Sequence, residues 1–336
     1  MIPTRTRRLL SIQPVADGGG SETALIRMVR ELTADGWECH VALPGPARLA
    51  AAYAAAGAVL HVVPMQRVTA QGSAPRWAAR YLLRWPVTVL RLAALARRCG
   101  VDVVHSNSLH SWYGWAAARL TGRPHVWHAR ELVVQSPAAL AVERLLARRF
   151  ATTVLATSHA VAAQLDPANV VVAYDTPDPE RFGPERAGHF RAGAGIPDDV
   201  PLVGSVSRID TWKGVDRLLD AAPVLRRARP DLEIVVAGAD VGGKEAYADE
   251  LRRRAAELGF VRWLGARSDV PELMADLDVL VQVSTAPEPF GLVHVEALAS
   301  GTPVVAGDEG GPVEILAGAT PGSGILVPAG DPAALA

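Results

Sequence analysis

Short apolar runs alternate with longer amphipathic stretches along the whole chain. In the first half, the apolar runs predict strands at 8–13, 38–43, 59–63, 101–105, 125–128, 152–156 and 170–173. In the second half, they predict strands at 201–206, 232–237, 261–264, 278–283, 302–306 and 324–327. The stretches between them predict helices at 22–34, 76–98, 213–229, 244–258 and 291–300. This alternation is typical of βαβ units, so we expect an α/β fold with mostly parallel sheets.

The periodicity lapses once, between Asp175 and Pro201, where prolines and glycines accumulate. The chain has 336 residues, more than about twice the usual size of a single hydrophobic core. We therefore expect two doubly wound domains, at 1–180 and 201–336, joined by a linker at 181–200. Ligands of such sheets bind beyond the carboxyl ends of the strands, so a cleft between the two domains is the expected site.

Charge is divided unevenly between the halves. Hydrophobic residues make up 49% and charged residues 21%, as in ordinary globular proteins. The net charge is −1, but through Glu185 there are 20 arginines against 13 acidic residues, a balance of +7. From Arg186 onward, 14 basic residues face 22 acidic ones, a balance of −8. The two halves therefore present different surfaces.

Several classes of protein are excluded by composition. Cys39 and Cys99 are too few for a disulfide framework or a thiolate metal site, and such a chain suits a reducing compartment. The N-terminal basic residues precede only about six apolar or small positions, too few for a signal peptide. No window approaches the roughly 20 apolar residues of a membrane span. We expect a cytoplasmic protein.

The densest group of polar residues at a strand end lies in 283–301, VSTAPEPFGLVHVEALASG. A loop carries Glu288, and a helix opens near Gly291 with Glu296 inside it. The unpaired N–H groups of a helix start attract anions, and Gly291 allows a ligand close to the backbone. Carboxylates repel phosphate, so we expect Glu288 and Glu296 to accept hydrogen bonds from sugar or ribose hydroxyls. Alternatively, each is an ordinary solvated glutamate.

A second group lies in 204–214, GSVSRIDTWKG. Arg208 follows a predicted strand and Lys213 begins the next helix, so both cations project where strands end. An ammonium suits phosphate as a point charge, and a guanidinium can bind two oxygens at once. Alternatively, Lys213 only begins a helix, although a cation is mildly unfavourable there.

In the first half, the segment 17–22, DGGGSE, follows a strand and opens a helix. Its glycines can bring backbone N–H groups close to a phosphate or sugar. The segment is not the GxGxxG dinucleotide fingerprint, so a plain strand-to-helix turn is an equal alternative.

A strand ending at His128 delivers that imidazole, Arg130 and Glu131 to the same edge. His125 and His128 are three residues apart on a strand and point to opposite faces, so no metal site is expected there. We expect His128 to face substrate rather than to be a core histidine. Asn107 and His110 end the preceding strand and are candidate acceptor-binding residues together with Arg130 and Glu131.

In this order, these segments resemble the retaining GT-B glycosyltransferases of the large family 4. The resemblance runs from the glycine-rich loop to Pro328, nearly the whole chain. Its most specific part is EPFGLVHVEALASGTPVVAGDEGGPVEIL, in which Glu288 and Glu296 match the family motif of two glutamates separated by seven residues. The segment RIDTWKGVDRLLDA is the second strong match.

The resemblance implies two Rossmann-like domains and a nucleotide diphosphate sugar as donor. By this resemblance, Arg208 and Lys213 bind the diphosphate and Glu296 binds the ribose. The donor sugar is bound by Glu288 with the backbone of Phe290, Gly291 and Leu292. The resemblance also brings Arg267 to the nucleobase, Gly19 and Gly20 to the phosphates, and His128 to the transferred sugar near its anomeric carbon.

The implied reaction transfers the sugar to a hydroxyl with retained anomeric configuration, without a cofactor or metal. Two features depart from the family pattern. AYDTPDPERF stands where many relatives have Asn-Gly. The sequence stops at GDPAALA, in which Asp331 and Pro332 look like the cap and first turn of a helix that relatives continue.

Other functions compete with this one. A GT-B epimerase would act on the nucleotide sugar without an acceptor, and a noncatalytic partner would bind nucleotide without turnover. A nicotinamide dehydrogenase fits poorly because neither half carries GxGxxG.

The acceptor is not defined by any motif, and a cell-envelope glycolipid, a polysaccharide or a secondary metabolite would each fit. Arg67–Arg98 holds seven arginines and no acidic residue. This segment could contact an anionic membrane or an acidic lipid-linked acceptor at the inner face of the membrane. Alternatively, it is a solvated face over a core helix. Nucleic acid is not expected.

Overall fold

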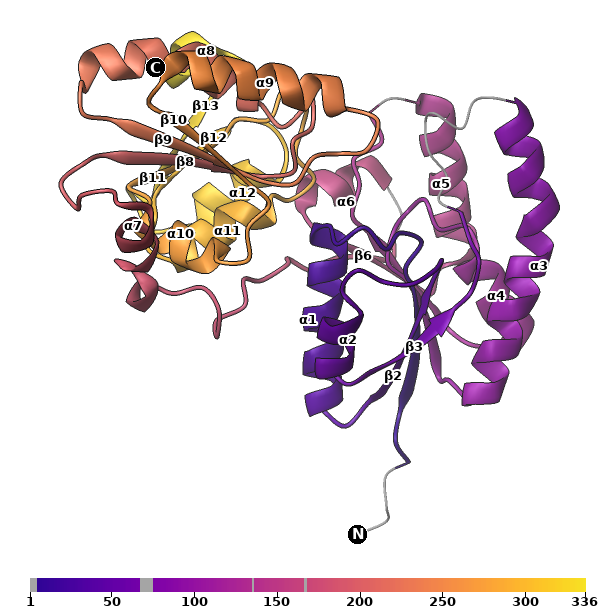
Figure 1. Cartoon of the computed structure of the whole chain (residues 1–336). Helices are drawn as coiled ribbons and strands as arrows, with labels where there is room; N and C mark the ends of the chain where they lie inside the picture. The colour runs from indigo at the N-terminus through magenta and orange to yellow at the C-terminus, as the bar shows by residue number, and fades with distance from the viewer. Residues whose placement is uncertain (1–4, 67–74, 135, 166–167) are drawn as a thin grey trace. The chain divides into compact units, whose positions relative to one another are not determined.

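The computed structural model describes residues 5–66, 75–134, 136–165 and 168–336. The chain divides into two compact units, Met1–Asp175 and Thr176–Ala336. Each unit has its own parallel sheet, with helices on both faces (Figure 1).

The first unit is built on a seven-stranded parallel sheet with the order β3-β2-β1-β4-β5-β6-β7. Its strands are β1 Arg8–Ile12, β2 Glu38–Leu43, β3 Ala58–Val62, β4 Val103–Ser106, β5 His125–Ala129, β6 Thr153–Ala156 and β7 Val170–Val172. Its helices are α1 Gly20–Ala34, α2 Ala50–Ala55, α3 Pro75–Cys99, α4 Gly114–Thr121, α5 Pro137–Phe150 and α6 His159–Leu165.

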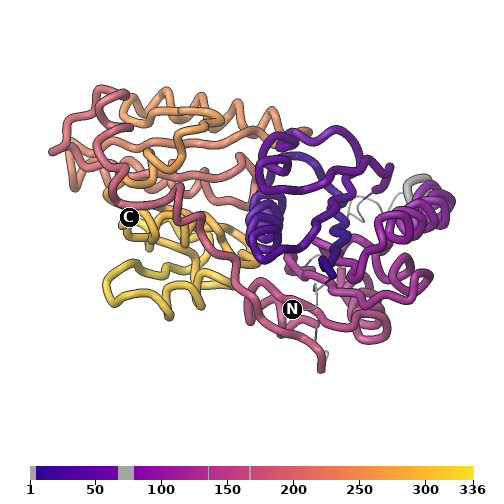
Figure 2. The backbone as a smooth tube through the Cα atoms, turned by 90° about the horizontal axis from the view of Figure 1, so that it is seen from below, coloured from indigo at the N-terminus to yellow at the C-terminus, as the bar shows by residue number. Residues whose placement is uncertain are grey.

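The two faces of this sheet are buried by different helices. Leu9, Val41 and Leu43 pack against α1 and α2, whereas Leu10 and Ala42 point the other way, into a core with α3 and α4. This alternation follows from the two-residue period of a strand. Figures 1 and 2 agree that α1 and α3 cover opposite faces.

The second unit is built on a six-stranded parallel sheet with the order β10-β9-β8-β11-β12-β13. Its strands are β8 Leu202–Val206, β9 Glu233–Ala237, β10 Val261–Gly265, β11 Val279–Gln282, β12 Val304–Gly307 and β13 Gly324–Val327. Its helices are the 3-10 turn η2 Pro184–Arg186, α7 His189–Ala194, α8 Val215–Ala228, α9 Glu245–Leu258, α10 Val270–Asp276, α11 Leu292–Ala299, α12 Gly311–Gly318 and α13 Pro332–Leu335. Figure 1 shows α8 and α9 on one face and α10, α11 and α12 on the other.

Each sheet has one point where the strand order reverses, between β1 and β4 in the first unit and between β8 and β11 in the second. At such a switch point the loops after the two neighbouring strands diverge to opposite faces of the sheet, which leaves a crevice at the carboxyl edge. The predicted glycine-rich loop follows β1, and the loops with Lys213 and Glu288 follow β8 and β11. The candidate residues thus belong to the positions where doubly wound sheets bind ligands.

The α/β prediction is confirmed, and each of the thirteen predicted apolar runs contains a strand. The predicted helices also form, and α3 continues through Pro86. Seven helices were not predicted, and most of them are short: α2, α4, α5, α6, α7, α10 and α12. Asp331 caps α13 as expected, since its Oδ1 accepts hydrogen bonds from the N–H groups of Ala333 and Ala334, at 2.9 and 3.2 Å.

The segment 181–200 differs from the linker that its prolines and glycines predicted. Phe182, Phe190 and Ile196 are buried in the core of the second unit. Arg191 is also buried, and its guanidinium binds Asp278 at 2.8 Å. Gly188 and Gly195, which interrupt the periodicity, cap the short α7 in left-handed conformations. The segment therefore belongs to the second unit, which begins at Thr176.

Candidate functional site

An ion pair between Lys213 and Glu288 lies at the switch point of the second unit. Lys213 comes from the loop between β8 and α8, and Glu288 from the loop between β11 and α11. Lys213 Nζ lies 2.6 Å from Glu288 Oε2, and the two side chains are 13% and 10% exposed. The two residues, which are 75 positions apart in sequence, therefore form one nearly buried charge pair.

Neighbouring groups fix both members of this pair. Lys213 Nζ lies 4.0 Å from the centre of the Trp212 ring, which adds a cation–π contact. Gln282 Nε2 donates to the carbonyl of Lys213 at 2.6 Å, and Ser284 Oγ donates to Glu288 Oε2 at 3.0 Å. The ammonium and the carboxylate are thus held in place by groups of the protein itself.

Burial by itself raises the pKa of Glu288, but the charge and hydrogen bond of Lys213 outweigh it. Together with the Ser284 hydrogen bond, they hold the pKa below the ordinary value of 4.5. Glu288 is therefore a carboxylate at neutral pH. It can accept hydrogen bonds from hydroxyls, and it cannot serve there as a proton donor.

The loop that carries Glu288 is packed tightly against the start of α12. Glu288 forms a parallel bridge with Gly310, and the N–H of Gly311 donates to the Glu288 carbonyl at 2.8 Å. A Cβ on Gly311 would lie 2.4 Å from Phe290 Cα, and one on Gly310 would lie 2.2 Å from the Glu288 carbonyl oxygen. Gly310 and Gly311 are therefore needed for the close approach of the Glu288 loop to α12. This role of the two glycines was not predicted.

Gly291 caps α11, as the sequence predicted. Its φ of +92° lies in the left-handed region, and an added Cβ would meet His294 Nδ1 at 2.2 Å. His294 is buried, and its Nδ1–H donates to the carbonyl of Gly291 at 3.0 Å. Glycine is thus required at position 291 by the protein's own packing, because His294 occupies the space that a Cβ would fill.

The other predicted donor-side residues surround this loop or follow other strands. Phe290 is buried. Leu292 and Glu296 are half-buried, and both lie in the first two turns of α11. Arg208 is exposed in the loop after β8. Arg267 follows β10 and is paired with Asp269, with Nε 2.6 Å from Oδ1.

Lys244, the second lysine, also pairs with a carboxylate near the switch point. It binds Asp210, which lies in the loop after β8 between Arg208 and Lys213, and Thr211 Oγ1 at 3.2 Å. Burial raises the pKa of Asp210, but Lys244, and to a lesser degree Arg208, hold it below its ordinary value. No role for Lys244 was predicted from the sequence.

In the first unit, carboxylates occupy part of the glycine-rich loop. The N–H of Gly18 donates to Glu22 Oε2 at 2.6 Å, and the N–H of Gly19 donates to Asp17 Oδ1 at 3.0 Å. Gly19 caps α1, and Gly20 is the exposed first residue of the helix, with open space where a Cβ would lie. The approach of a phosphate to Gly18 or Gly19 would therefore require these two carboxylates to move.

Arg130 connects residues from four strand ends of the first unit. Its Nε donates to Asn107 Oδ1 at 2.7 Å, and its NH1 lies 2.6 Å from Asp175 Oδ2. Asn107 Nδ2 in turn donates to Gln13 Oε1 at 2.8 Å, across the switch point. Three of the predicted residues, Asn107, Arg130 and His128, therefore lie in one network.

His128 is buried at the end of β5, with 4% of its surface exposed. Arg130 NH2 lies 3.5 Å from its Nδ1, and because a guanidinium only donates, the ring carries its proton on Nε2. This Nε2 is buried and has no hydrogen-bond partner among the described residues. Burial first, and then the charge of Arg130, hold the pKa well below its ordinary value, so the ring is neutral.

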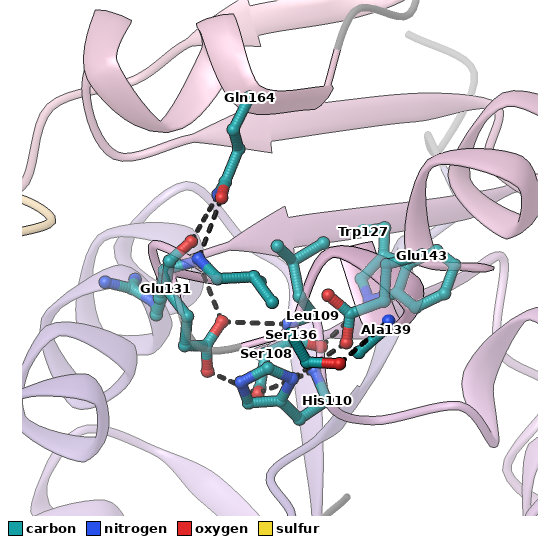
Figure 3. A network of polar contacts seen from close by, with 11 residues as sticks. Ser108, Leu109, His110, Trp127, Glu131, Ser136, Ala139, Glu143 and Gln164 are labelled. Carbon is teal, nitrogen blue, oxygen red and sulfur yellow. Dashed lines mark hydrogen bonds and ion pairs between the residues drawn. The ribbon is translucent and has the colours of Figure 1, made fainter. Parts of the chain in front are cut away.

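His110 and Glu131 hold the loop after β4 in place (Figure 3). Glu131 accepts hydrogen bonds from Ser108 Oγ at 2.5 Å and from the N–H of Leu109 at 3.0 Å. His110 Nδ1 donates to Glu143 Oε1 of α5 at 2.8 Å, and the Glu143 side chain is fully buried. The two predicted acceptor residues thus engage protein groups that anchor the loop.

Known proteins are similar to this chain in sequence and in fold. The model of "Glycosyltransferase Family 4" matches residues 18–181, and that of "Glycosyl transferases group 1" matches residues 188–336. The lipopolysaccharide core biosynthesis mannosyltransferase LpsB of Rhizobium meliloti is 32% identical over 250 residues, which cover 66% of this chain and 69% of that protein. The D-inositol 3-phosphate glycosyltransferase of Streptomyces scabiei is 34% identical, over 70% of this chain and 58% of that protein.

Among solved structures, Anabaena HepE in complex with UDP and glucose superposes with a TM-score of 0.80 at 27% identity. The match covers 97% of this chain and 87% of that one. The lipopolysaccharide biosynthesis glycosyltransferase WaaG matches with a TM-score of 0.67 at 19% identity, over 96% of this chain and 86% of that one, a likeness of fold.

The fold and these relatives define a GT-B glycosyltransferase. The chain belongs to the family of the group 1, or family 4, glycosyltransferases, as its motifs around Lys213 and Glu288 indicated.

Proposed function

We propose that the protein transfers a sugar from a nucleotide diphosphate sugar to an acceptor hydroxyl, with retention of anomeric configuration. The observation that carries this proposal is the Lys213–Glu288 pair at the switch point of the second unit. Family membership supports it, as does the similarity to HepE, whose structures contain UDP, UDP with glucose, or UDP-glucose.

Lys213 and Arg208 are suited to the diphosphate. An ammonium has three N–H donors, of which Glu288 takes one, so Lys213 can contact phosphate oxygens while remaining paired. Arg208 is exposed in the same loop. The negative charge that develops on the departing diphosphate would be stabilised by these fixed cations and by the helix start at Leu292.

Glu288 and His128 are suited to sugar hydroxyls. The lowered pKa of Glu288 keeps it an acceptor of hydrogen bonds. The buried Nε2–H of His128 has no protein partner among the described residues, so an oxygen atom of the transferred sugar would satisfy it. In keeping with the family pattern, Glu296 would bind the ribose, Arg267 with its loop would lie near the nucleobase, and Gly19 and Gly20 near the phosphates.

Retention would follow a front-face route. Neither the buried, ion-paired Glu288 nor the neutral His128 is placed here as a nucleophile. The leaving phosphate would instead help to remove the proton of the acceptor hydroxyl. We expect turnover to persist after chelation of divalent ions, because the cations Lys213 and Arg208 can carry the charge stabilisation.

A panel of UDP-, GDP- and dTDP-sugars tests the donor, first by thermal shift and then by nucleotide release with candidate acceptors. Lys213→Ala with Arg208→Ala should reduce turnover by at least about 1000-fold, corresponding to about 4 kcal/mol of lost transition-state stabilisation. Arg227→Ala, which removes an exposed arginine from α8, is the matched control.

Four results would contradict the proposal in whole or in part. Full activity in the double variant would remove the assigned diphosphate site. Conversion of the nucleotide sugar without acceptor would indicate an epimerase. Nucleotide binding without turnover across the acceptor panel would indicate a noncatalytic partner. An inverted product anomer, observed by NMR, would overturn retention alone.

We further propose that the acceptor is an envelope glycolipid or polysaccharide and that the protein works at the cytoplasmic face of a membrane. The similarity to a lipopolysaccharide core mannosyltransferase supports this acceptor class. No helix among the described residues is long and apolar enough to cross a bilayer. Contact with the membrane would therefore be peripheral.

The exposed face of α3 is the proposed contact surface. Leu83, Val87 and Leu90 are 77%, 50% and 60% exposed, and their spacing of four and three residues aligns them along the helix. Arg84 and Arg91 are exposed one position further along the chain than Leu83 and Leu90, so they form a parallel row. An apolar stripe beside arginines suits an anionic bilayer. Residues 67–74 of the predicted basic segment lie outside the described residues.

Vesicle sedimentation tests this surface. Wild-type protein should bind phosphatidylglycerol vesicles at low salt and release them at high salt. Replacement of Arg80, Arg84 and Arg91 by Gln should abolish binding, whereas Arg227→Gln should leave it unchanged. Equal binding to neutral vesicles, or no binding at low salt, would contradict the proposal.

A further inference from the structure

Two imidazoles and one thiol meet on the α3 face of the first-unit sheet. His40 lies on β2, His61 on β3, and Cys99 is the last residue of α3. In the sheet register Ala42 pairs with His61, so His40 and His61 are diagonal neighbours on the same face. His40 Nδ1 lies 3.1 Å from His61 Nε2, and the ligand atoms of all three residues lie within 4.8 Å of one another.

These separations fit the coordination sphere of a tetrahedral metal ion. With Zn–N bonds of about 2.0–2.1 Å and Zn–S bonds of about 2.3 Å, neighbouring ligand atoms are about 3.3–3.6 Å apart. The two nitrogens already lie near this separation. A small rotation of the Cys99 side chain would bring the sulfur to the same range.

Glu38 lies beside the ring nitrogen of His40 that faces away from His61. Glu38 Oε1 lies 3.1 Å from His40 Nε2, and Arg8 Nε lies 2.7 Å from Glu38 Oε2. A carboxylate this close to Nε2 favours a proton there, which would leave the Nδ1 lone pair toward His61. His40 Nδ1 and His61 Nε2 share one hydrogen bond, so a bound ion would take the place of the proton between them, which would move to His61 Nδ1 or to solvent. Metal-binding histidines usually have such a carboxylate on the far nitrogen.

Charges of both signs lie near the cluster, with Glu38 favouring a cation at His40 and Arg8 opposing it. A bound Cys99 would be a thiolate, and the carbonyl end of the α3 dipole contributes further negative potential. The charge of Arg8 is already paired with Glu38, whereas Arg98 acts on His61 and opposes a cation. His61 and Cys99 are only half-buried, so an ion can reach them from solvent.

We propose that His40, His61 and Cys99 bind a zinc ion, with water as the fourth ligand. This site would overturn the expectation that two cysteines are too few for a thiolate metal site, because two histidines supply the other protein ligands. Two imidazoles and a thiolate are ligands that Zn²⁺ prefers over Mg²⁺ or Ca²⁺. Cys99 lies near the amino ends of the strands, because Arg8, the first residue of β1, donates from NH1 to the Cys99 carbonyl at 3.3 Å. His40 is in the middle of β2, and His61 is level with Ala42 in the sheet register. The site is separate from the loops at the carboxyl ends, and it would tie the end of α3 to the edge strand β3.

Cobalt substitution tests this site in the full-length protein. Metal-free wild type titrated with Co²⁺ should develop a thiolate-to-cobalt charge-transfer band and the intense visible bands of a tetrahedral ion, which saturate at one equivalent and are displaced by Zn²⁺. The chain has only two cysteines. Cys99→Ala should abolish the charge-transfer band, whereas Cys39→Ala, on the opposite face of the sheet, should retain it.

The histidines are tested in the same titration. His61→Ala should weaken Co²⁺ binding by at least tenfold, and Glu38→Gln by about 10–100-fold, the usual effect of an outer-shell carboxylate. His189→Ala, at an exposed histidine of the second unit, should change nothing. Equal affinity in wild type and His61→Ala would overturn the site.

A stability measurement separates loss of the metal from loss of the fold. Without metal, Cys99→Ala should melt at the same temperature as wild type, because Cys99 is half-buried. With excess Zn²⁺, only wild type should melt several degrees higher, since an ion that binds the folded chain stabilises it. No thiolate band in wild type, or the same zinc-induced rise in Cys99→Ala, would overturn the proposal. Neither readout depends on glycosyl transfer.

Discussion

The Lys213–Glu288 pair joins two charges that the sequence placed in separate motifs. The residue types, their position at strand ends and the capping role of Gly291 could be predicted because each depends on a short segment. The pairing itself, and the support from Gln282, Ser284 and His294, could not be predicted. These contacts depend on the register of β8 and β11 and on packing below α11.

Lys213→Met should lower the free energy of unfolding, because it leaves the buried Glu288 carboxylate without its partner. Removal of one partner from a nearly buried pair costs about 3 kcal/mol, because the other charge remains without compensation. In the wild type, the lowered pKa of Glu288 adds stability above its ordinary value of 4.5, and this stability is lost as the pH falls through the folded-state pKa. In the variant, burial alone raises the pKa, so the folded state binds the extra proton.

The deficit of Lys213→Met, measured by chemical denaturation, should therefore be largest near pH 7 and shrink toward about pH 5. The double variant Lys213→Met with Glu288→Gln should recover most of the stability at neutral pH. A deficit that does not change with pH would show that the pair carries no such charge penalty.

Gly291→Ala should destabilise the start of α11. A left-handed alanine costs roughly 1–2 kcal/mol, and its Cβ would also displace His294. We expect a lower melting temperature and weaker nucleotide binding in the same variant. Gly318→Ala, at a glycine with open space around it, is the control and should leave both unchanged.

At the scale of elements, the short helices were harder to predict than the strands. The helices α4 and α12 span only eight residues each, about two turns, which is too short for a helical period to stand out in the sequence. By contrast, the start of α5 could have been recognised in the sequence. Ser136 caps it by accepting a hydrogen bond from the N–H of Ala139, and Pro137 occupies its first turn. The segment 181–200 was misjudged because glycines that cap α7 resemble glycines of a linker.

The loop after β4 depends on Glu131, whose backbone carbonyl also accepts from Gln164 of α6 at 2.5 Å. Glu131→Gln replaces one acceptor oxygen by a donor, which cannot accept from Ser108 or Leu109. We expect a loss of about 1–3 kcal/mol, as for an unsatisfied buried hydrogen-bonding group. Nucleotide affinity, measured by calorimetry, should remain unchanged, because Lys213 and Glu288 belong to the other unit. A parallel loss of nucleotide affinity would contradict this separation.

At the scale of the whole molecule, each unit encloses its own cores. In the second unit, one core lies under α8 and α9 and another under α10 and α11. The alternation of apolar runs made the two-unit organisation predictable. The boundary at Asp175 was less predictable, because the prolines near it continue into a segment that is partly buried in the second unit.

A fragment of residues 176–336 should therefore fold alone and bind nucleotide. Far-UV circular dichroism should show a cooperative melt, and UDP or another nucleoside diphosphate should raise its midpoint. The same fragment with Lys213→Ala should melt cooperatively but respond much less to nucleotide. A fragment that folds without any nucleotide response would place part of the nucleotide site outside the second unit.

The scarcity of lysine makes the loop that carries Lys213 accessible to selective labelling. Amine-reactive reagents find only Lys213, Lys244 and the chain's amino terminus, since every other basic side chain is arginine or histidine. Both lysines are in ion pairs with carboxylates, and Lys213 is the less exposed. Acylation of Lys213, followed by mass spectrometry with Lys244 as internal reference, should slow further when nucleotide binds. A single modified peptide would then report occupancy of the donor site in mixtures where no product can be detected.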